Sequence, residues 1–206
     1  MRTFKKIFVL FIGPLAILVF AYLIVDSISQ PVRFNKELEM RKAVVVERLK
    51  DIRTLQVAYK GVFGAFSNSI DTLIDFYNNG QMTIIRQVGS WDDSLAVARK
   101  QVYRDSVKIA VQDTLFNHRP NFHIDSLRFI PFSGKREFIV ETATRQISGI
   151  SVPLFAASAP YEYLLSGMDK QLIINLIAEQ KDVYKRYEGV RVGSIEAPNN
   201  NAGNWE

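Results

Sequence analysis

The chain contains no cysteine among its 206 residues. This absence excludes disulfide scaffolds, iron–sulfur clusters, thiolate zinc sites and cysteine nucleophiles. It also excludes lipoprotein processing, which modifies a cysteine. A chain exported into an oxidising compartment either pairs its cysteines or avoids them, so their absence is compatible with a domain outside the cytoplasm.

Histidine is nearly absent as well, because only His118 and His123 occur, flanked by Asp113 and Asp125. A strong zinc signal would place two histidines four residues apart on a helix with a glutamate between them, whereas Pro120 lies between this pair. The Gly-x-Ser-x-Gly elbow and glycine-rich phosphate loops are also missing. The sequence therefore predicts no catalytic residue, no cofactor and no metal site, and a protein that is not an enzyme.

The formal net charge of +5 and the pI of about 9.4 come from basic residues that are mixed with acidic ones along the chain. Nucleic-acid binding requires a concentrated basic face, so nucleic acid is not an expected partner. The one cluster without acids is Arg2, Lys5 and Lys6, and it directly precedes an apolar segment.

That segment, Ile7–Val25, has 19 residues and no charge. As a helix it would measure roughly 28 Å, close to the hydrocarbon thickness of a bilayer. The cations before it and Asp26 after it place residues 1–6 in the cytoplasm by the positive-inside rule. The expectation is a single-pass inner-membrane protein that contacts lipid through residues 7–25 and has its bulk in the periplasm. A cleaved signal peptide is the alternative, but the apolar run exceeds the usual signal length.

Residues 26–80 are expected to be helical. Nothing breaks a helix from Phe34 to about Lys60, and Pro31 is expected to mark its start. Apolar residues at alternating three- and four-residue steps form a narrow stripe, interrupted by Gln56. The stripe is either one side of the domain's own core or, in its first part, a coiled-coil face for a partner. The predicted protein-interaction face consists of Leu38, Val45, Leu49 and Ile52.

A break near the glycines that follow, Gly61 and Gly64, separates this helix from a shorter one predicted over Ser69–Asn78, with Ser67 or Ser69 as its cap. Residues 81–196 are expected to form an α+β domain with a small, mostly antiparallel sheet. Strands are predicted at Met82–Val88, Ser106–Leu115, Phe122–Phe132, Arg136–Arg145, Ile150–Ala159 and Val190–Ile195. Helical segments are predicted at residues 91–102, Tyr161–Leu165 and Met168–Arg186, and residues 197–206 are expected to be an irregular tail.

The stretch Arg41–Tyr77 resembles the helix that follows the membrane anchor in type IV pilins and pseudopilins. It shares a run ending in Gln-x-Ala-Tyr, a glycine-containing turn, then an aspartate and a short apolar helix. The apolar segment differs from pilins, because Gly13 is followed by Pro14 and no glutamate occurs within it. The overall layout also resembles bitopic assembly-platform proteins of type IV pilus and type II secretion machines. These resemblances imply a pilin-like or ferredoxin-like fold.

A third resemblance rests on Tyr103–Phe116, Phe122–Ser133 and Gly189–Glu206, which look like a family of membrane-anchored proteins in Bacteroidota. It implies membrane anchoring and no particular activity. The expected function is therefore that of a non-enzymatic periplasmic protein, anchored in the inner membrane, that acts by protein–protein interaction. Its expected partners are further copies of itself or other envelope proteins, as in a scaffold of a pilus- or secretion-like machine. The alternative is a ligand-binding or sensory module that works through a membrane partner.

Overall fold

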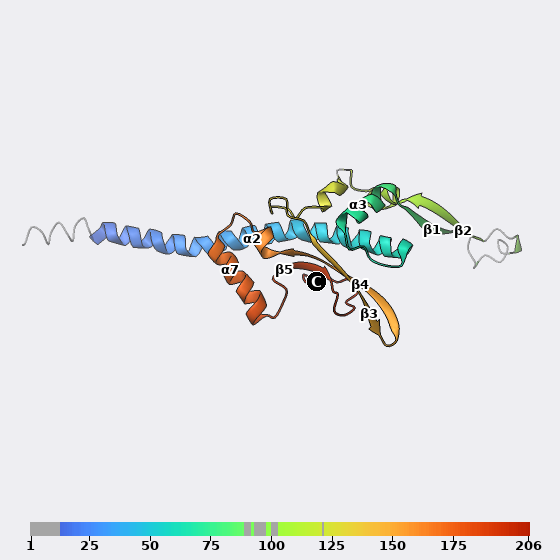
Figure 1. Ribbon diagram of the computed structural model, residues 1–206. Helices are drawn as coiled ribbons and strands as arrows, with labels where there is room; N and C mark the ends of the chain where they lie inside the picture. The colour runs from blue at the N-terminus through green and yellow to red at the C-terminus, as the bar shows by residue number, and fades with distance from the viewer. Residues whose placement is uncertain (1–12, 89–91, 93–97, 100–102, 121) are drawn as a thin grey trace, which may run out of the picture.

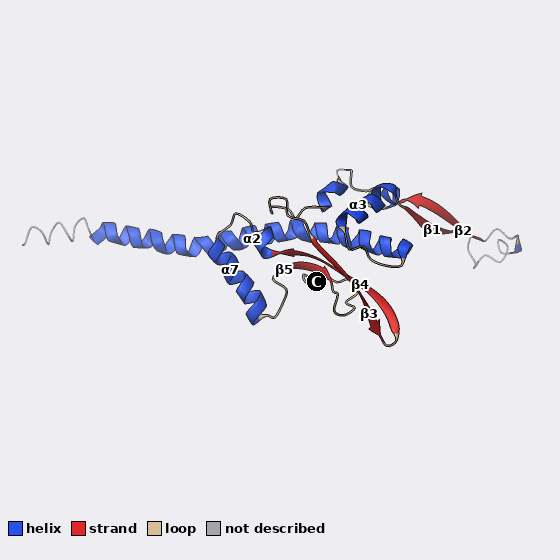
Figure 2. Ribbon diagram, viewed as in Figure 1, coloured by secondary structure: helices blue, strands red, loops and turns tan. Residues whose placement is uncertain are grey.

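A computed structural model describes residues 13–88, 92, 98–99, 103–120 and 122–206 of the chain (Figure 1). One long helix is followed by short helices and two small antiparallel sheets, which confirms the predicted α+β class (Figure 2). The elements are α2 (Gly13–Phe63), α3 (Ile70–Asn79), β1 (Gln81–Val88), β2 (Tyr103–Ala110), α5 (Val111–Thr114), the 3₁₀ turn η2 (Ile124–Leu127), β3 (Ile139–Ile147), β4 (Ile150–Pro160), α6 (Tyr161–Leu164), α7 (Lys170–Ala178), the π-helical turn η3 (Glu179–Val183) and β5 (Gly189–Gly193).

Helix α2 runs for 51 residues through both the apolar segment and the predicted helix after it. Pro31 lies inside α2, so its prediction as a helix start is wrong. A proline removes one backbone hydrogen bond and costs about 3 kcal/mol, which long flanking helical segments on both sides can offset. The helix ends where Gly64 adopts a φ of +76° and donates its N–H to the Lys60 carbonyl at 2.8 Å. This left-handed glycine explains the predicted break.

The first part of α2 carries the apolar character expected of a membrane span. It is the one helix of the described residues that is long and apolar enough to cross a membrane, and none of its most apolar window is buried. The large apolar side chains from Leu15 to Val32 point to the exterior, whereas Phe34 is the first buried residue of α2. The domain therefore begins at Phe34.

Helix α3 begins as predicted. Ser69 is its N-cap, and the Ser69 hydroxyl accepts a hydrogen bond from the Asp71 N–H at 3.2 Å. The Ser67 hydroxyl in turn accepts from the Ser69 N–H at 3.2 Å, so both serines contribute to this helix start. Gly80 closes the helix by donating its N–H to the Phe76 carbonyl.

The larger sheet has the order β3-β4-β5 and is antiparallel throughout. Its central strand β4 is buried from Leu154 to Ala159, and α2 packs across β4 and β5. β5 pairs with residues 156–160 of β4, so Pro153 lies in the part of β4 that only β3 borders. A proline is tolerated there because no neighbour on the other side needs its N–H.

The smaller sheet is the two-stranded ribbon β1–β2, with Ile84 opposite Val107. It projects beyond the C-terminal end of α2 (Figure 1). The predicted strand Met82–Val88 is confirmed. The predicted strand Ser106–Leu115 is correct to Ala110, after which the chain turns into α5. The helix predicted for residues 91–102 lies almost entirely outside the described residues.

The predicted strand Phe122–Phe132 is wrong. It contains the 3₁₀ turn η2 and one isolated bridge, between Phe129 and Glu137. Its buried residues Ile124, Leu127 and Ile130 recur every third position, which is the period of a 3₁₀ turn. The predicted helix Met168–Arg186 is confirmed for α7 and passes into the π-helical turn η3.

The C-terminal residues form turns that run beside β5. Asn204 donates its N–H to the Arg191 carbonyl at 2.9 Å, and its side chain bonds both the Arg191 N–H and the Gly189 carbonyl. Trp205 packs against the core. The tail therefore covers the edge of β5 that would otherwise be open.

Candidate protein-interaction site

The predicted interaction face lies inside the domain. Leu38 is 7% exposed, and Val45, Leu49 and Ile52 are 0% exposed. All four belong to one hydrophobic core with residues of β4, β5 and α6. The alternative interpretation, in which the stripe is one side of the domain's own core, accounts for this burial. The surface on which a partner helix was expected is occupied by the chain itself.

Gln56, the polar gap in the stripe, has a structural role. It is fully buried; its amide nitrogen donates to the Ser67 carbonyl at 2.7 Å, and its oxygen accepts from the Ser67 N–H at 2.9 Å. These two bonds satisfy the backbone of the turn between α2 and α3. Gln56 therefore fixes the turn by which the chain reverses direction after α2.

Beyond Gln56, the last turns of α2 present apolar side chains to the exterior. Val57 is 50%, Val62 43% and Phe63 58% exposed. Phe63 contacts Tyr59 and Phe76, with ring centroids 4.5 and 5.8 Å away, and this contact fixes its position. The end of α2 thus carries apolar surface that its own domain does not cover.

The ribbon β1–β2 adds to this surface. Each of its strands pairs only with the other, so among the described residues each keeps one edge without a strand neighbour. Ile85 is 68% exposed on one face, and the opposed pair Ile84 and Val107 is 36% and 38% exposed on the other. Unpaired strand edges with exposed apolar side chains are the usual template for pairing with another chain.

A groove joins the two features. It has a volume of about 320 Å³ and lies between α2 and β1, lined by Ala58, Gly61, Val62, Gln81, Met82, Thr83 and Ile84. Four consecutive residues of β1 border it, as expected when the edge of a strand, rather than one face, forms the wall. On the α2 side, Gly61 leaves the groove open, because no atom lies within 4 Å of the position that a Cβ at residue 61 would occupy.

A second hollow of about 770 Å³ continues the groove, since Ala58 and Met82 line both. Its far end is polar. There Arg53 donates to the Glu206 carboxylate at 2.6 Å, and this bond lowers the pKa of Glu206. Together the two hollows form one open groove, with the β1 edge at one end and the Arg53–Glu206 pair at the other.

A separate cluster of charged and aromatic residues stabilises the fold. Asp51 is buried and pairs with Arg119 at 2.5 Å, while the Arg119 guanidinium lies over the rings of Phe116 and Phe122 at 4.7 and 4.8 Å. Burial raises the pKa of Asp51, and the Arg119 bond offsets part of that rise. The cluster attaches the loop after α5 to the middle of α2.

His118 and His123 lie on the loop between α5 and η2. His118 lines a hollow of about 300 Å³ beside Arg48 and Arg119, and His123 precedes η2. No three His, Asp or Glu side chains among the described residues converge as metal ligands. The arrangement around these residues is that of a polar loop held by an ion pair.

The groove was missed in the sequence because its residues come from segments that the chain brings together only after the turn at Ser67. One signal was available. Val57 and Val62 lie off the stripe, and Met82 and Ile84 alternate in register with Val107 and Ile109. Apolar residues outside the core pattern mark a second apolar surface.

No protein-family model, curated protein or solved structure matches this chain.

Proposed function

We propose that this chain is a single-pass inner-membrane protein whose periplasmic domain binds an extended segment of another envelope protein in the groove between α2 and β1. The observation that carries the proposal is the edge of β1 that has no strand neighbour among the described residues and lies beside an apolar helix end. Residues 7–25 anchor the chain, with the N-terminus in the cytoplasm, on the basis of the flanking charges.

Strand addition suits this groove for a physical reason. A bound segment would satisfy the open N–H and C=O groups of β1, which gives affinity independent of sequence. Its alternate side chains would contact Val62 and Ile84, which gives selectivity for apolar residues. A two-stranded ribbon alone is marginally stable, so a third strand would also stabilise β1–β2 itself.

The contrast with the larger sheet supports this choice. The chain covers the outer edge of β5 with its own tail, through Asn204 and the bridge from Val192 to Gly203. Natural proteins cover or blunt strand edges that have no partner. The edge of β1, which no other strand of the described residues covers, lies beside exposed isoleucines and is therefore the better candidate for a binding role.

The test is photo-crosslinking in the membranes of cells that produce the full chain, with a photoreactive residue at Ile85 or Val62. The matched control is Ile150, which has the same exposed fraction of 68% as Ile85 and also lies on a hairpin. We expect crosslinks from Ile85 and Val62 that map to one segment of one partner, and their loss when Ile84→Lys is introduced.

Crosslinks of equal yield from Ile150, or none from Ile85 and Val62, would exclude the groove as the binding site. A product that contains only two copies of this chain would replace the envelope partner by self-association. Retention of the crosslinks in the Ile84→Lys variant would exclude strand addition at β1.

A further inference from the structure

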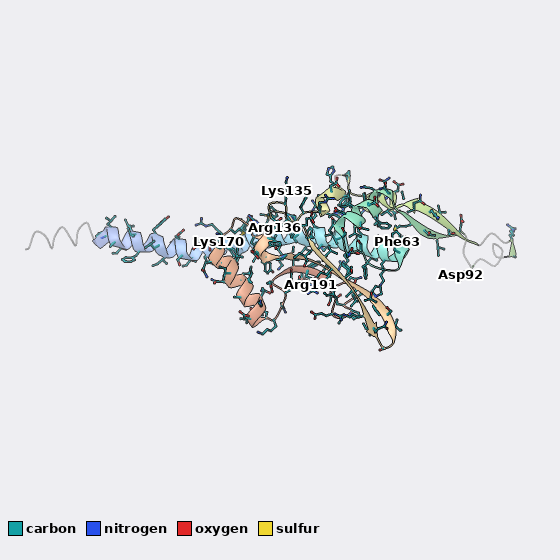
Figure 3. All side chains as sticks on the ribbon, in the orientation of Figure 1. Phe63, Asp92, Lys135, Arg136, Lys170 and Arg191 are labelled. Atoms are coloured by element: carbon teal, nitrogen blue, oxygen red, sulfur yellow. The ribbon has the colours of Figure 1, made fainter. Side chains whose placement is uncertain are left out.

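The groove beside β1 follows one face of α2. The α2 residues that line its two hollows form two adjacent rows at four-residue spacing: Arg53, Val57 and Gly61, and Thr54, Ala58 and Val62. Residues at this spacing lie on the same side of a helix. The rows end beside Phe63, which Figure 3 shows at the end of α2. Val62 follows Arg53 by nine residues, so the groove extends about 13–14 Å along α2.

The wall opposite α2 changes its chemistry along this length. At the Val62 end it is the edge of β1, which has no strand neighbour on this side among the described residues. At the Arg53 end it is the C-terminal tail, through residues 200–202 and Glu206. Met82 lines both hollows, so the two parts of the wall meet there. A segment that pairs with β1 and continues along the groove would therefore reach Arg53.

Arg53 already binds a carboxylate. Its guanidinium donates to the Glu206 carboxylate at 2.6 Å and to the Asn201 carbonyl at 3.3 Å. The bond from Arg53 and, to a smaller extent, the charge of Lys50 lower the pKa of Glu206, so this end of the groove has a positive potential. The Arg53 and Glu206 side chains are 28% and 43% exposed, and an ion pair this exposed contributes little to stability. A carboxylate of another chain could therefore take the place of Glu206 at little cost.

This exchange would leave the tail folded. Trp205 packs against the core, and the Glu206 N–H donates to the Gly203 carbonyl at 3.2 Å. Both contacts hold the backbone of the tail beside β5, and neither involves the Glu206 carboxylate. Only the Glu206 side chain would therefore have to rotate for another carboxylate to reach Arg53.

The length of the groove sets the spacing of side chains in a bound segment. An extended chain rises about 3.3 Å per residue, so the distance from Val62 to Arg53 corresponds to about four residues. Side chains four positions apart point to the same face of a strand. One side chain can therefore contact Val62 and Ile84 while the other reaches Arg53. The hollow at Arg53 is open to solvent, so the bound chain can continue beyond this position.

We infer that the segment bound in the groove carries an aspartate or glutamate four residues from the apolar residue that contacts Val62 and Ile84, and that this carboxylate replaces Glu206 at Arg53. The inference rests on the proposed function, because it specifies the sequence that strand addition at β1 selects. The backbone bonds to β1 are the same for any sequence. An apolar contact at one end and a charge-assisted hydrogen bond at the other fix the register of the bound segment.

The test uses the full chain in detergent micelles, with a photoreactive residue at Val62, and two fluorescent peptides that are blocked at both ends. One peptide alternates threonine with valine or isoleucine and has an aspartate at each end, four positions from its central isoleucine. The other has asparagine in place of both aspartates. Because each peptide is symmetric in sequence, either direction of binding is covered. We expect both to crosslink at Val62 and the aspartate peptide to bind about three- to fivefold more tightly, as an exposed ion pair allows.

Substitutions on both sides of the ion pair locate this effect. In Arg53→Gln we expect the two peptides to bind equally well. In Glu206→Gln we expect the aspartate peptide to bind more tightly than to the wild type, because it no longer displaces a carboxylate. Arg48→Gln is the matched control, since it removes the same charge from α2 but Arg48 lines a separate hollow with His118. The preference for aspartate should remain in that variant, and circular dichroism checks that each variant is folded.

The outcomes separate this inference from the proposed function. If both peptides crosslink at Val62 and bind with equal affinity, binding in the groove stands and the inferred acidic residue is overturned. If neither peptide crosslinks, the groove does not take an extended apolar segment, and the inference fails together with the proposed function. A preference for aspartate that persists in Arg53→Gln, or weaker binding of the aspartate peptide to Glu206→Gln, would overturn the replacement of Glu206.

Discussion

Gln56 shows how one polar residue can direct the path of a chain. Its two hydrogen bonds to the Ser67 backbone lie where no water reaches, since Gln56 is 0% and Ser67 5% exposed. Replacing it by leucine would keep the volume but leave a buried N–H and a buried C=O without partners.

We expect Gln56→Leu to lower the free energy of unfolding by about 2–4 kcal/mol, from two unsatisfied buried groups. The measurement is chemical denaturation of the full chain in detergent, followed by circular dichroism. Gln171→Leu is the matched control, because Gln171 is an exposed helical glutamine whose side chain donates to the Asn175 side chain at 2.9 Å. Equal stability of the two variants would contradict the role given to Gln56.

Asp51 gives a prediction for the dependence of stability on pH. Burial raises the pKa of Asp51 in the folded state above its unfolded value. The folded state therefore binds the proton more tightly than the unfolded state, and this contribution to stability is largest at low pH and is lost as the pH rises through the folded pKa.

The comparison of wild type with Asp51→Asn isolates this effect. As the pH falls from neutral through the raised pKa, we expect the wild type to gain stability relative to the variant, measured as the difference in Tm. Asp71→Asn, which removes an exposed partner of Arg128, controls for general effects of an Asp–Arg pair. If wild type instead loses stability relative to Asp51→Asn on acidification, the bond from Arg119 outweighs burial.

At the scale of the element, two adjacent valines lie on different faces of α2, one buried and one exposed. Val45 is 0% exposed within the core, whereas Val44 is 37% exposed. We expect Val45→Asp to unfold the domain, because it buries a charge without a partner. Val44→Asp should change stability by less than about 1 kcal/mol, in line with surface substitutions.

Thermal unfolding of the two variants, followed by circular dichroism, checks this prediction. If Val45→Asp remained folded and only lost a bound partner, the stripe would be an interface after all. If Val44→Asp also unfolded the domain, the outer face of α2 would be covered in the full protein.

The elements that could be predicted are those whose pattern depends on local chemistry. The helix α2, the cap at Ser69 and the strand β4 follow from apolar periodicity and turn residues. The segment around η2 was misread because Phe122, Ile124, Ile130 and Phe132 share one phase of a two-residue alternation, whereas the buried Leu127 departs from it and fits a three-residue period. Pro31 was misread because a single proline does not end a helix when the segments before and after it both favour helix formation.

The site was harder to predict than the fold. A stripe of apolar residues identifies a buried face of α2 but does not say whether the covering surface belongs to the same chain. That is decided by contacts between α2, which ends at Phe63, and β4 or β5, which begin only at Ile150 and Gly189. The groove likewise requires the hydrogen bonds between Gln56 and Ser67, which bring β1 beside Ala58 and Gly61.

The whole molecule is organised along α2. This single helix passes from the expected span, through the core, to the groove at its far end, and Figure 3 shows Phe63 at that end, remote from the apolar segment. A continuous helix is stiff over this length, so it would hold the groove at a set distance from the membrane.

The height of the groove above the bilayer tests this arrangement. Val62 follows Val25 by 37 residues, and a helix of that length tilted by about 20° rises roughly 50–55 Å. We expect energy transfer from a label at Val62→Cys to acceptor lipids to report that height, whereas a label at Val32→Cys should report roughly 10 Å. A Val62 height below about 30 Å would require a sharp bend in α2, for which Pro31 is the natural position. In that case the groove would lie near the membrane, and the partner sought by crosslinking would have to be a membrane-surface segment rather than one that reaches across the periplasm.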